Sequence, residues 1–155
     1  MSKAFTKDDG PAAPEIARHR PPLPAGPNHV TAAGLRALRA ELARLDAAPM
    51  EAGARGAAWR AELEGRIATA VVAAPPRDRD EVRLGARVGL RGADGHTRAL
   101  TIVGVDEADA SNGRIAFMAP VARALLGRRR GDVVSIRSPS GEDDVEIVSV
   151  LYAEP

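Results

Sequence analysis

The residues that could carry acid–base or metal chemistry are few and far apart. The chain has three histidines, His19, His29 and His96, and no cysteine. No pair of these histidines has the spacing of a metal site on a helix or hairpin. Neither a Ser-His-Asp order nor a glycine-rich loop leading from a strand into a helix is suggested. We therefore expect no catalytic residue, no metal and no cofactor.

The longest run of basic residues is Arg128-Arg129-Arg130, which stands just before a Gly-Asp pair. Cations are favourable near the C-terminal end of a helix, where the helix dipole is negative. A solvated turn that follows the expected short helix is therefore the simpler interpretation of this run. A contact to an acidic partner or to nucleic acid is the alternative. The residues by themselves leave both interpretations open.

Composition excludes several classes of function. Among 155 residues, 22 Lys and Arg balance 21 Asp and Glu, and aromatic residues make up 3%. The balanced charge argues against wrapping of nucleic acid, and the few aromatics argue against base stacking. No apolar run approaches the roughly 20 residues of a membrane helix, and residues 1–10 lack the apolar stretch of a signal peptide. We expect a cytoplasmic protein without membrane contact.

The elements that position these residues fall into three sections. The first, residues 1–29, is predicted to be a disordered or extended arm, with a partner-binding polyproline stretch as the alternative. Proline removes a backbone donor and fixes φ, and too little apolar surface is present to be buried. The prolines of this section are Pro11, Pro14, Pro21, Pro22, Pro24 and Pro27.

Residues 30–76 are predicted to form an antiparallel hairpin of two helices. Thr31 can cap the first helix and Pro49 ends it. The second run ends at Pro75 and Pro76, and the turn is expected over residues 50–56. Helices of about 18 residues would project roughly 27 Å. The stripes that would face each other are Leu35, Leu38, Leu42 and Leu45 in the first helix and Trp59, Leu63, Ile67 and Ala70 or Val71 in the second.

The third section, residues 81–155, is predicted to be an antiparallel β-sheet with one short helix, so that the whole chain is α+β. We expect strands over 87–91, 97–105, 114–118, 132–137 and 144–151. The short helix is expected over 120–127, because proline suits a first helical turn and glycine suits the position after the end. The apolar run from Val145 to Val150 changes phase, which predicts a bulge or a strand covered on both faces.

A resemblance to a known family rests on particular residues of the third section. The stretch 115–127, Ile-Ala-Phe-Met-Ala-Pro-Val-Ala-Arg-Ala-Leu-Leu-Gly, is followed by Gly-Asp-Val-Val at 131–134 and Pro-Ser-Gly-Glu at 139–142. It closely resembles the C-terminal domain of the bacterial GreA/GreB transcript-cleavage factors. The opening of the hairpin, from Val30 to Leu42, is similar to the family's first helix, and residues 1–6 look like a GreB start.

The resemblance implies a fold and a mechanism. The C-terminal domain would be FKBP-like and would dock on core RNA polymerase at the rim of its secondary channel. The coiled coil would enter the channel, where two acids in a G-D-x-S-E-N motif at its tip help hold a second Mg²⁺ in the polymerase active site. The factor itself would not be an enzyme.

The sequence departs from that family pattern at the hairpin tip. The joint lacks a G-D-x-S-E-N motif, and its carboxylates are Asp46 and Glu51, which we expect to be ordinary surface acids. A coiled coil with about 30 residues per helix would reach about 45 Å, well beyond the expected hairpin. Both differences predict docking without stimulation of cleavage. This shortened plan resembles the regulator of nucleoside diphosphate kinase, which also fits the Met-Ala-Pro sequence at 118–120.

The resemblance assigns the docking surface to the short helix and its surroundings. Leu125 and Gly127 are expected to be structural, and Ala119 leaves the helix without a side-chain cap. We expect a monomer bound to polymerase, with a weak nucleic-acid contact through that complex left open. The alternatives are a peptidyl-prolyl isomerase and an interaction module with another partner. The residues expected to bind polymerase are Met118, Pro120, Arg123, Leu126, Arg128, Arg129 and Arg130.

Overall fold

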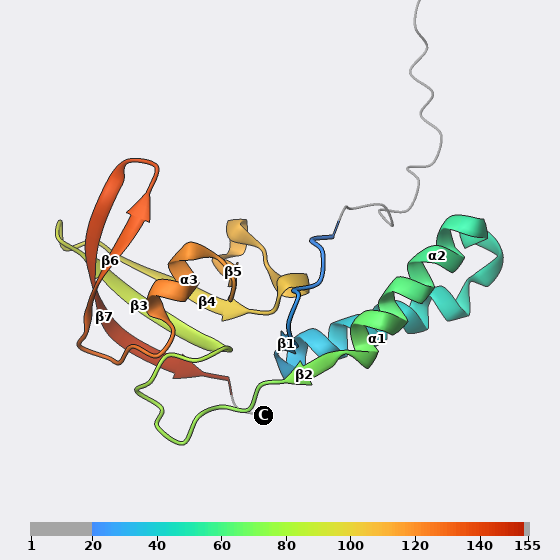
Figure 1. Cartoon of the computed structure of the whole chain (residues 1–155), viewed down its shortest axis with the longest axis horizontal. Coiled ribbons are helices and arrows are strands. Elements are labelled where there is room, and N and C mark those ends of the chain that lie inside the picture. The colour runs from blue at the N-terminus through green and yellow to red at the C-terminus, as the bar shows by residue number, and fades with distance from the viewer. Residues whose placement is uncertain (1–19, 154–155) are drawn as a thin grey trace, which may run out of the picture.

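The computed structural model describes residues 20–153, apart from the side chains of residues 49–52. A helical hairpin lies on one side and a curled β-sheet module on the other, and they meet near β1 and β2 (Figure 1). The order of helices and strands confirms the α+β class expected from the sequence.

The hairpin consists of α1 (Ala32–Ala47) and α2 (Pro49–Ala68). The Thr31 hydroxyl caps α1 by accepting a hydrogen bond from the backbone N–H of Gly34 at 3.0 Å. The seam between the helices buries Leu38 and Leu63, which are 2% and 0% exposed. Helices this short are marginal in water, so the shared apolar seam is what stabilises them.

The hairpin tip differs from the turn expected over residues 50–56. The second helix already begins at Pro49, because a first helical turn tolerates the fixed φ and missing N–H of proline. A kink at Gly53, with φ +52° and ψ −152°, then interrupts it. Glycine adopts this backbone conformation more readily than residues with a side chain. The connection between the helices is therefore reduced to Ala48, with the irregularity moved into α2.

The base of the hairpin holds a small sheet that the sequence analysis missed. The second helix ends at Ala68, short of the expected end near residue 74, and β2 (Ala70–Val72) follows. It pairs in parallel with β1 (Asn28–Val30), since β-branched valines favour extended backbone. The expected arm, residues 1–29, thus overlaps a strand at its end, and its residues 1–19 lie outside the described part of the chain.

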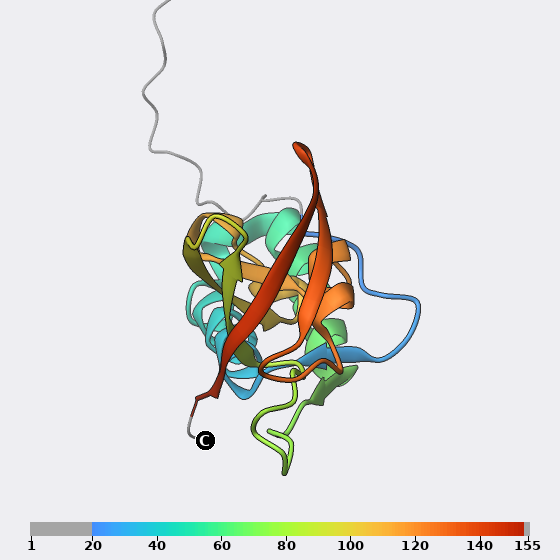
Figure 2. The same ribbon diagram turned by 90° about the vertical axis from the view of Figure 1, so that its left-hand side faces the viewer.

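The module is built on a five-stranded sheet with the order β5-β4-β3-β7-β6, and α3 (Pro120–Leu125) packs beside β6. Figure 2 shows the long β6–β7 hairpin rising above the rest of the sheet. All five strands lie at their expected positions. Their bounds are β3 Ala86–Gly92, β4 Thr97–Val103, β5 Arg114–Ala116, β6 Val133–Ser138 and β7 Gly141–Tyr152.

The expectation of a wholly antiparallel sheet is wrong at one edge. Strand β5 runs parallel to β4, with Thr101 opposite Arg114 and Val103 opposite Ala116. Two short 3₁₀ turns, η1 (Val105–Glu107) and η2 (Ala110–Asn112), connect them. This connection carries the chain back along β4, so that β5 starts beside the middle of β4 and runs in the same direction. The alternation of apolar and polar residues along a strand does not show whether the strand runs parallel or antiparallel to its neighbour.

The bulge expected near Val148 is confirmed. Gly89 of β3 lies opposite Ser149, whereas the next residue, Leu90, lies opposite Ile147, so Val148 is skipped. An extra residue on one strand shifts the side-chain alternation by one position. As a result Ile147 and Val150 both face the core, at 0% and 7% exposed.

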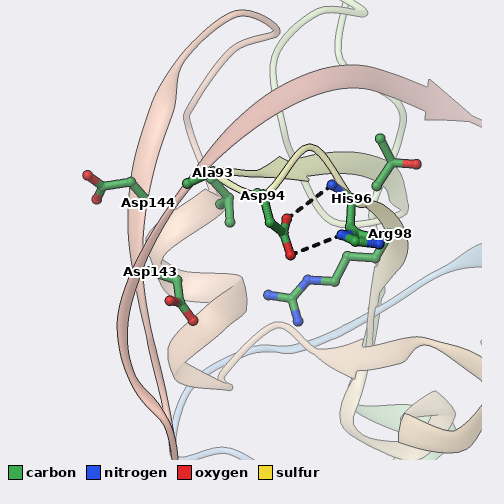
Figure 3. A pocket seen from close by; sticks show the side chains of 9 residues that line it. Ala93, Asp94, His96, Arg98, Asp143 and Asp144 are labelled. Atoms are coloured by element: carbon green, nitrogen blue, oxygen red, sulfur yellow. Dashed lines mark hydrogen bonds and ion pairs between the residues drawn. The ribbon is translucent and has the colours of Figure 1, made fainter.

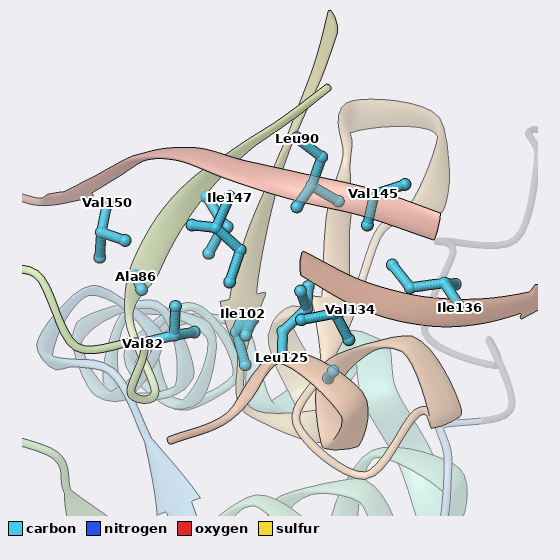
Figure 4. Close-up of a cluster of buried hydrophobic side chains, with 12 residues drawn as sticks. Val82, Ala86, Leu90, Ile102, Leu125, Val134, Ile136, Val145, Ile147 and Val150 are labelled. Carbon is cyan, nitrogen blue, oxygen red and sulfur yellow. The ribbon is translucent and has the colours of Figure 1, made fainter. Parts of the chain in front are cut away.

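The core of the module lies between the sheet and α3 (Figure 4). Two residues of the helix, Ala122 and Leu125, are fully buried against it. Because α3 has six residues, it depends on this packing rather than on its own hydrogen bonds. The largest fully buried side chains of this core are Leu90, Ile102, Leu125, Ile136, Ile147, Val82 and Val88.

Candidate functional site

The surface around α3 carries most of the residues expected to contact a partner. Pro120 occupies the first turn of the helix, and Ala119 before it makes no side-chain cap, as expected. Met118 is 38% exposed and Arg123 projects to solvent, whereas Leu125 is 0% exposed. The side chains of Met118 and Arg123 are therefore available to a partner, and that of Leu125 belongs to the core.

The three arginines after α3 differ in their surroundings. Arg129 forms an ion pair with Asp78, and Arg130 pairs with Asp80 at 3.3 Å. Arg128 has no carboxylate partner among the described residues, although its backbone carbonyl accepts from Val82 N–H at 2.8 Å. Asp78 and Asp80, in the linker before β3, therefore neutralise two of the three positive charges. The spacing of residues along the sequence did not predict which arginines would be paired.

A groove runs beside α3, between the module and the base of the hairpin. It encloses about 610 Å³ and includes Leu126. His29 and Phe117 meet in it edge to face, with ring centroids 5.9 Å apart. Sequence analysis placed His29 at the end of an arm and missed the groove, because its walls come from distant parts of the chain. The lining is completed by Ala73, Ala74, Pro76, Glu81, Arg83, Leu84 and Gly127.

The linker that contributes to this groove is anchored by Tyr152. The tyrosine hydroxyl accepts from the backbone N–H of Arg83 at 2.9 Å and donates to the carbonyl of Glu81. Partial burial is the main reason that the pKa of Tyr152 is raised. Arg79 also lies over its ring, 5.8 Å from the centroid. These contacts attach the linker to the end of β7.

The hairpin tip offers no pair of free carboxylates among the described side chains. Asp46 forms an ion pair with Arg60 at 2.9 Å, and Arg60 also pairs with Glu64 at 3.1 Å. The side chain of Glu51 lies outside the described part. Among the described side chains, Asp46 is thus a single acid already paired with an arginine, and not the pair of acids that would help to hold Mg²⁺. With 16 residues, α1 is about 24 Å long, close to the expected reach.

The joint between hairpin and module is an ionic and hydrogen-bonded contact around η1. Asp106 accepts hydrogen bonds from Arg66 at 2.8 Å and from Arg20 at 3.3 Å. Glu107 accepts from the backbone N–H groups of Thr31 and Gly104, both at 3.1 Å. Glu107 thus supports the start of α1, where a negative charge is favourable.

Close packing accompanies the hydrogen bonds of Glu107. A Cβ atom on Gly34 would lie 2.2 Å from the Glu107 side chain, so a larger residue there would displace the Glu107 carboxylate from its present position. Sequence analysis missed this joint, because its residues show no local pattern.

The loop after η1 carries a strongly hydrogen-bonded acid. Asp109 accepts from the Ser111 hydroxyl at 2.5 Å, from the Asn112 amide at 2.6 Å and from Arg114 at 3.4 Å. These bonds, that from Ser111 above all, lower the pKa of Asp109 to about 2. Asp109 is therefore a fixed negative charge at neutral pH that holds the loop leading into β5.

A second cavity, of about 390 Å³, lies between the β3–β4 turn and the β6–β7 hairpin. Figure 3 shows Asp94 and His96 on one side and Asp143 and Asp144 on the other, with Arg98 between them. The backbone N–H of His96 donates to Asp94 at 3.0 Å and is the main reason that the pKa of Asp94 is lowered. None of the expected docking residues lies here.

Metal and membrane sites are not found in the described part of the chain. Among residues 20–153, no group of three or more His, Asp or Glu side chains is placed to hold a metal ion. Within the same residues, no helix has both the length and the apolar character needed to span a bilayer.

A helical hairpin joined to a curled, mixed β-sheet with one short helix defines a two-part α+β protein. A profile of the family described as "Transcription elongation factor, GreA/GreB, C-term" matches residues 76–152. Through these residues the chain belongs to the GreA/GreB family, which confirms the resemblance found in the sequence.

Curated relatives cover part of the chain. It is 40% identical over 92 residues to transcription elongation factor GreB of Neisseria meningitidis, which is 58% of this chain and 56% of that protein. It is 47% identical over 74 residues to transcription elongation factor GreA of Desulfovibrio desulfuricans, covering 47% of this chain and 46% of that protein. The chain thus spans about half the length of the curated relatives it matches.

Solved structures align over more of the chain. The GreA/GreB elongation factor from Nitrosomonas europaea matches 80% of this chain and 98% of its own at 28% identity, with a TM-score of 0.45. GreA factor homolog 1 of Thermus thermophilus matches 79% and 97% at 24% identity, with a TM-score of 0.44.

Proposed function

We propose that this chain binds RNA polymerase at the entrance of the secondary channel and regulates transcription elongation without stimulating transcript cleavage. The observation that carries the proposal is that the family match, residues 76–152, contains the whole surface around α3. In that surface Met118, Arg123 and Arg128 are exposed and Leu126 opens onto the groove. The protein would act as a monomer in the cytoplasm, without a cofactor or catalysis of its own.

The hairpin supports the second half of the proposal. A helix of 16 residues is about 24 Å long, whereas a helix of about 30 residues would reach about 45 Å. Its described tip acid, Asp46, is already paired with Arg60. A short hairpin with a neutralised acid would occupy the channel entrance and would not deliver a carboxylate to the active site.

A peptidyl-prolyl isomerase is a weaker alternative for the module. Such catalysis needs a shaped apolar pocket with aromatic walls. Among the residues that line the groove beside α3, Phe117 is the one Phe, Tyr or Trp. No specific observation favours isomerase activity, so we do not propose it.

Reversing the free charges beside α3 should weaken polymerase binding. We expect the double substitution Arg123→Glu and Arg128→Glu to raise the Kd for purified core RNA polymerase at least about tenfold, a loss of about 1.4 kcal/mol. Like charges that face each other across an interface are unfavourable, and neither arginine has an ion pair to lose among the described residues. Fluorescence anisotropy with a labelled chain would measure the Kd.

The matched control is Arg137→Glu, which reverses an exposed charge on β6 that is not among the expected docking residues. It should leave the Kd within about twofold, as expected for a charge outside the interface. Failure of the unaltered chain to bind at micromolar concentration would refute the proposal. If the double variant bound as tightly as the unaltered chain, the docking surface would have to lie elsewhere on the molecule.

A cleavage assay on arrested elongation complexes tests the other half. In the presence of the chain, polymerase should release no more short RNA than it does alone. Asp46→Asn should not change the amount released, because Asp46 is paired with Arg60. Cleavage that is strong and depends on Asp46 or Glu51 would show that the tip is functional.

A further inference from the structure

The segment just before β1 contacts both halves of the molecule. Arg20 donates one guanidinium N–H to Asp106 of η1 at 3.3 Å and pairs through the other side with Glu41 of α1. The same guanidinium lies over the ring of Trp59 in α2, 5.1 Å from its centroid. One side chain therefore touches both hairpin helices and the module.

The backbone of the same segment reinforces this contact. The carbonyl of Pro21 accepts a hydrogen bond from Arg66 at 2.9 Å. Arg66 in turn donates to Asp106 at 2.8 Å, and the side chains of both are 3% exposed. Residues 20 and 21 thus bind a buried ion pair that already joins α2 to η1.

The contacts available without this segment are few. Apart from it, the polar contacts between the hairpin and η1 among the described residues are those of Glu107 with Thr31 and of Asp106 with Arg66, beside the close packing of Gly34 on Glu107. These contacts cluster at one end of α1 and α2, so they fix where the hairpin is attached more firmly than the angle at which it projects. Arg20 adds a contact further along α1, at Glu41, and a tilt of the hairpin would have to break it.

We propose that residues 20 and 21 form a strap that sets the angle between the hairpin and the β-sheet module, with Arg20 as the positioning residue. The strap needs the positive charge of Arg20, which bridges two carboxylates and faces the electron-rich ring of Trp59. Without it the hairpin would sample a wider range of angles. Loss of the Arg20 contacts would reduce the free-energy difference between the present orientation of the hairpin and other orientations, so that several would be populated.

The absence of cysteine from the chain makes a direct measurement simple. Spin labels on Ala43→Cys in α1 and Arg87→Cys in β3, both exposed positions, report the distance between hairpin and module. In this background, Arg20→Ala should make the distance distribution about twofold wider or shift its centre. Circular dichroism should show that the helix and strand content is unchanged.

Three controls separate the strap from a general loss of stability. Arg36→Ala removes an exposed α1 arginine without a carboxylate partner among the described residues, and it should leave the distribution narrow. Deletion of residues 1–19 should also leave it narrow, since Arg20 and Pro21 make the contacts. Arg20→Lys should give an intermediate width, because lysine keeps a pair with one carboxylate but cannot bridge Asp106 and Glu41 while stacking on the Trp59 ring.

The single tryptophan gives a second readout. Loss of the Arg20 guanidinium should uncover Trp59 and increase acrylamide quenching of its fluorescence.

The same narrow distribution in Arg20→Ala would overturn the proposal. A broad distribution after deletion of residues 1–19 would assign the strap to other residues. A Lys variant as narrow as the unaltered chain would rule out the guanidinium bridge between the two carboxylates. The measurement requires no polymerase, so its outcome is independent of the proposed function.

Discussion

Replacing Leu125 with alanine should lower the free energy of unfolding of the module by about 3–4 kcal/mol. The Leu125 side chain is 0% exposed and attaches α3 to the core between the helix and the sheet. Truncation removes apolar contacts and leaves a cavity that the rigid sheet cannot fill. Urea denaturation followed by far-UV circular dichroism would measure the loss.

The adjacent residue provides the control for this prediction. Leu126 is half-buried at the edge of the groove, so Leu126→Ala should cost about 1 kcal/mol, as is common for partly exposed sites. Among folded molecules, Leu126→Ala should weaken polymerase binding more than Leu125→Ala does, because Leu126 belongs to the proposed docking surface. Equal costs of unfolding for the two variants would contradict the division between core and surface.

The second large effect is expected at the joint. Asp106→Ala should lower the free energy of unfolding by about 3 kcal/mol, since removing one partner leaves a buried charge uncompensated. The Arg66 side chain is 3% exposed, but it also pairs with Glu62, which keeps the loss at the low end of the usual 3–5 kcal/mol. Calorimetry would measure the change, and Glu142→Ala, an exposed β7 acid, should stay within about 0.5 kcal/mol.

A paired substitution distinguishes the lost charge from the lost packing. Asp106→Val combined with Arg66→Met removes both charges and changes the volume of the pair little, so it should recover most of the stability lost in Asp106→Ala. A double variant as unstable as the single one would mean that the shape of Asp106, rather than its charge, determines the stability of the joint.

Local patterns predicted much of the molecule. The proline at 120 and the glycine at 127 bracket α3 as expected, because both act through backbone preferences that need no partner. The phase change after Val145 predicted the bulge opposite Gly89, since side-chain alternation is a property of one strand. The leucine stripe of α1 likewise predicted which face Leu38 would bury.

The charged site was harder to predict. Arg128, Arg129 and Arg130 are identical in type and adjacent in sequence, yet Asp78 and Asp80 take up two of them. Those aspartates approach only because the linker folds back along the segment after α3. Charge pairing depends on distances in space, which spacing along the chain does not contain.

The sequence by itself determined the two hairpin helices, α3 and the five strands of the module in their order, the missing acidic motif at the tip and the family, because these depend on residue types and short spacings. Tertiary structure decided the parallel direction of β5, the pairing of β1 with β2 and the joint at Asp106. It also brought Arg20 and His29 against residues more than 80 positions away. Such contacts form when the hairpin and the sheet bury surface against each other, and no local preference specifies them.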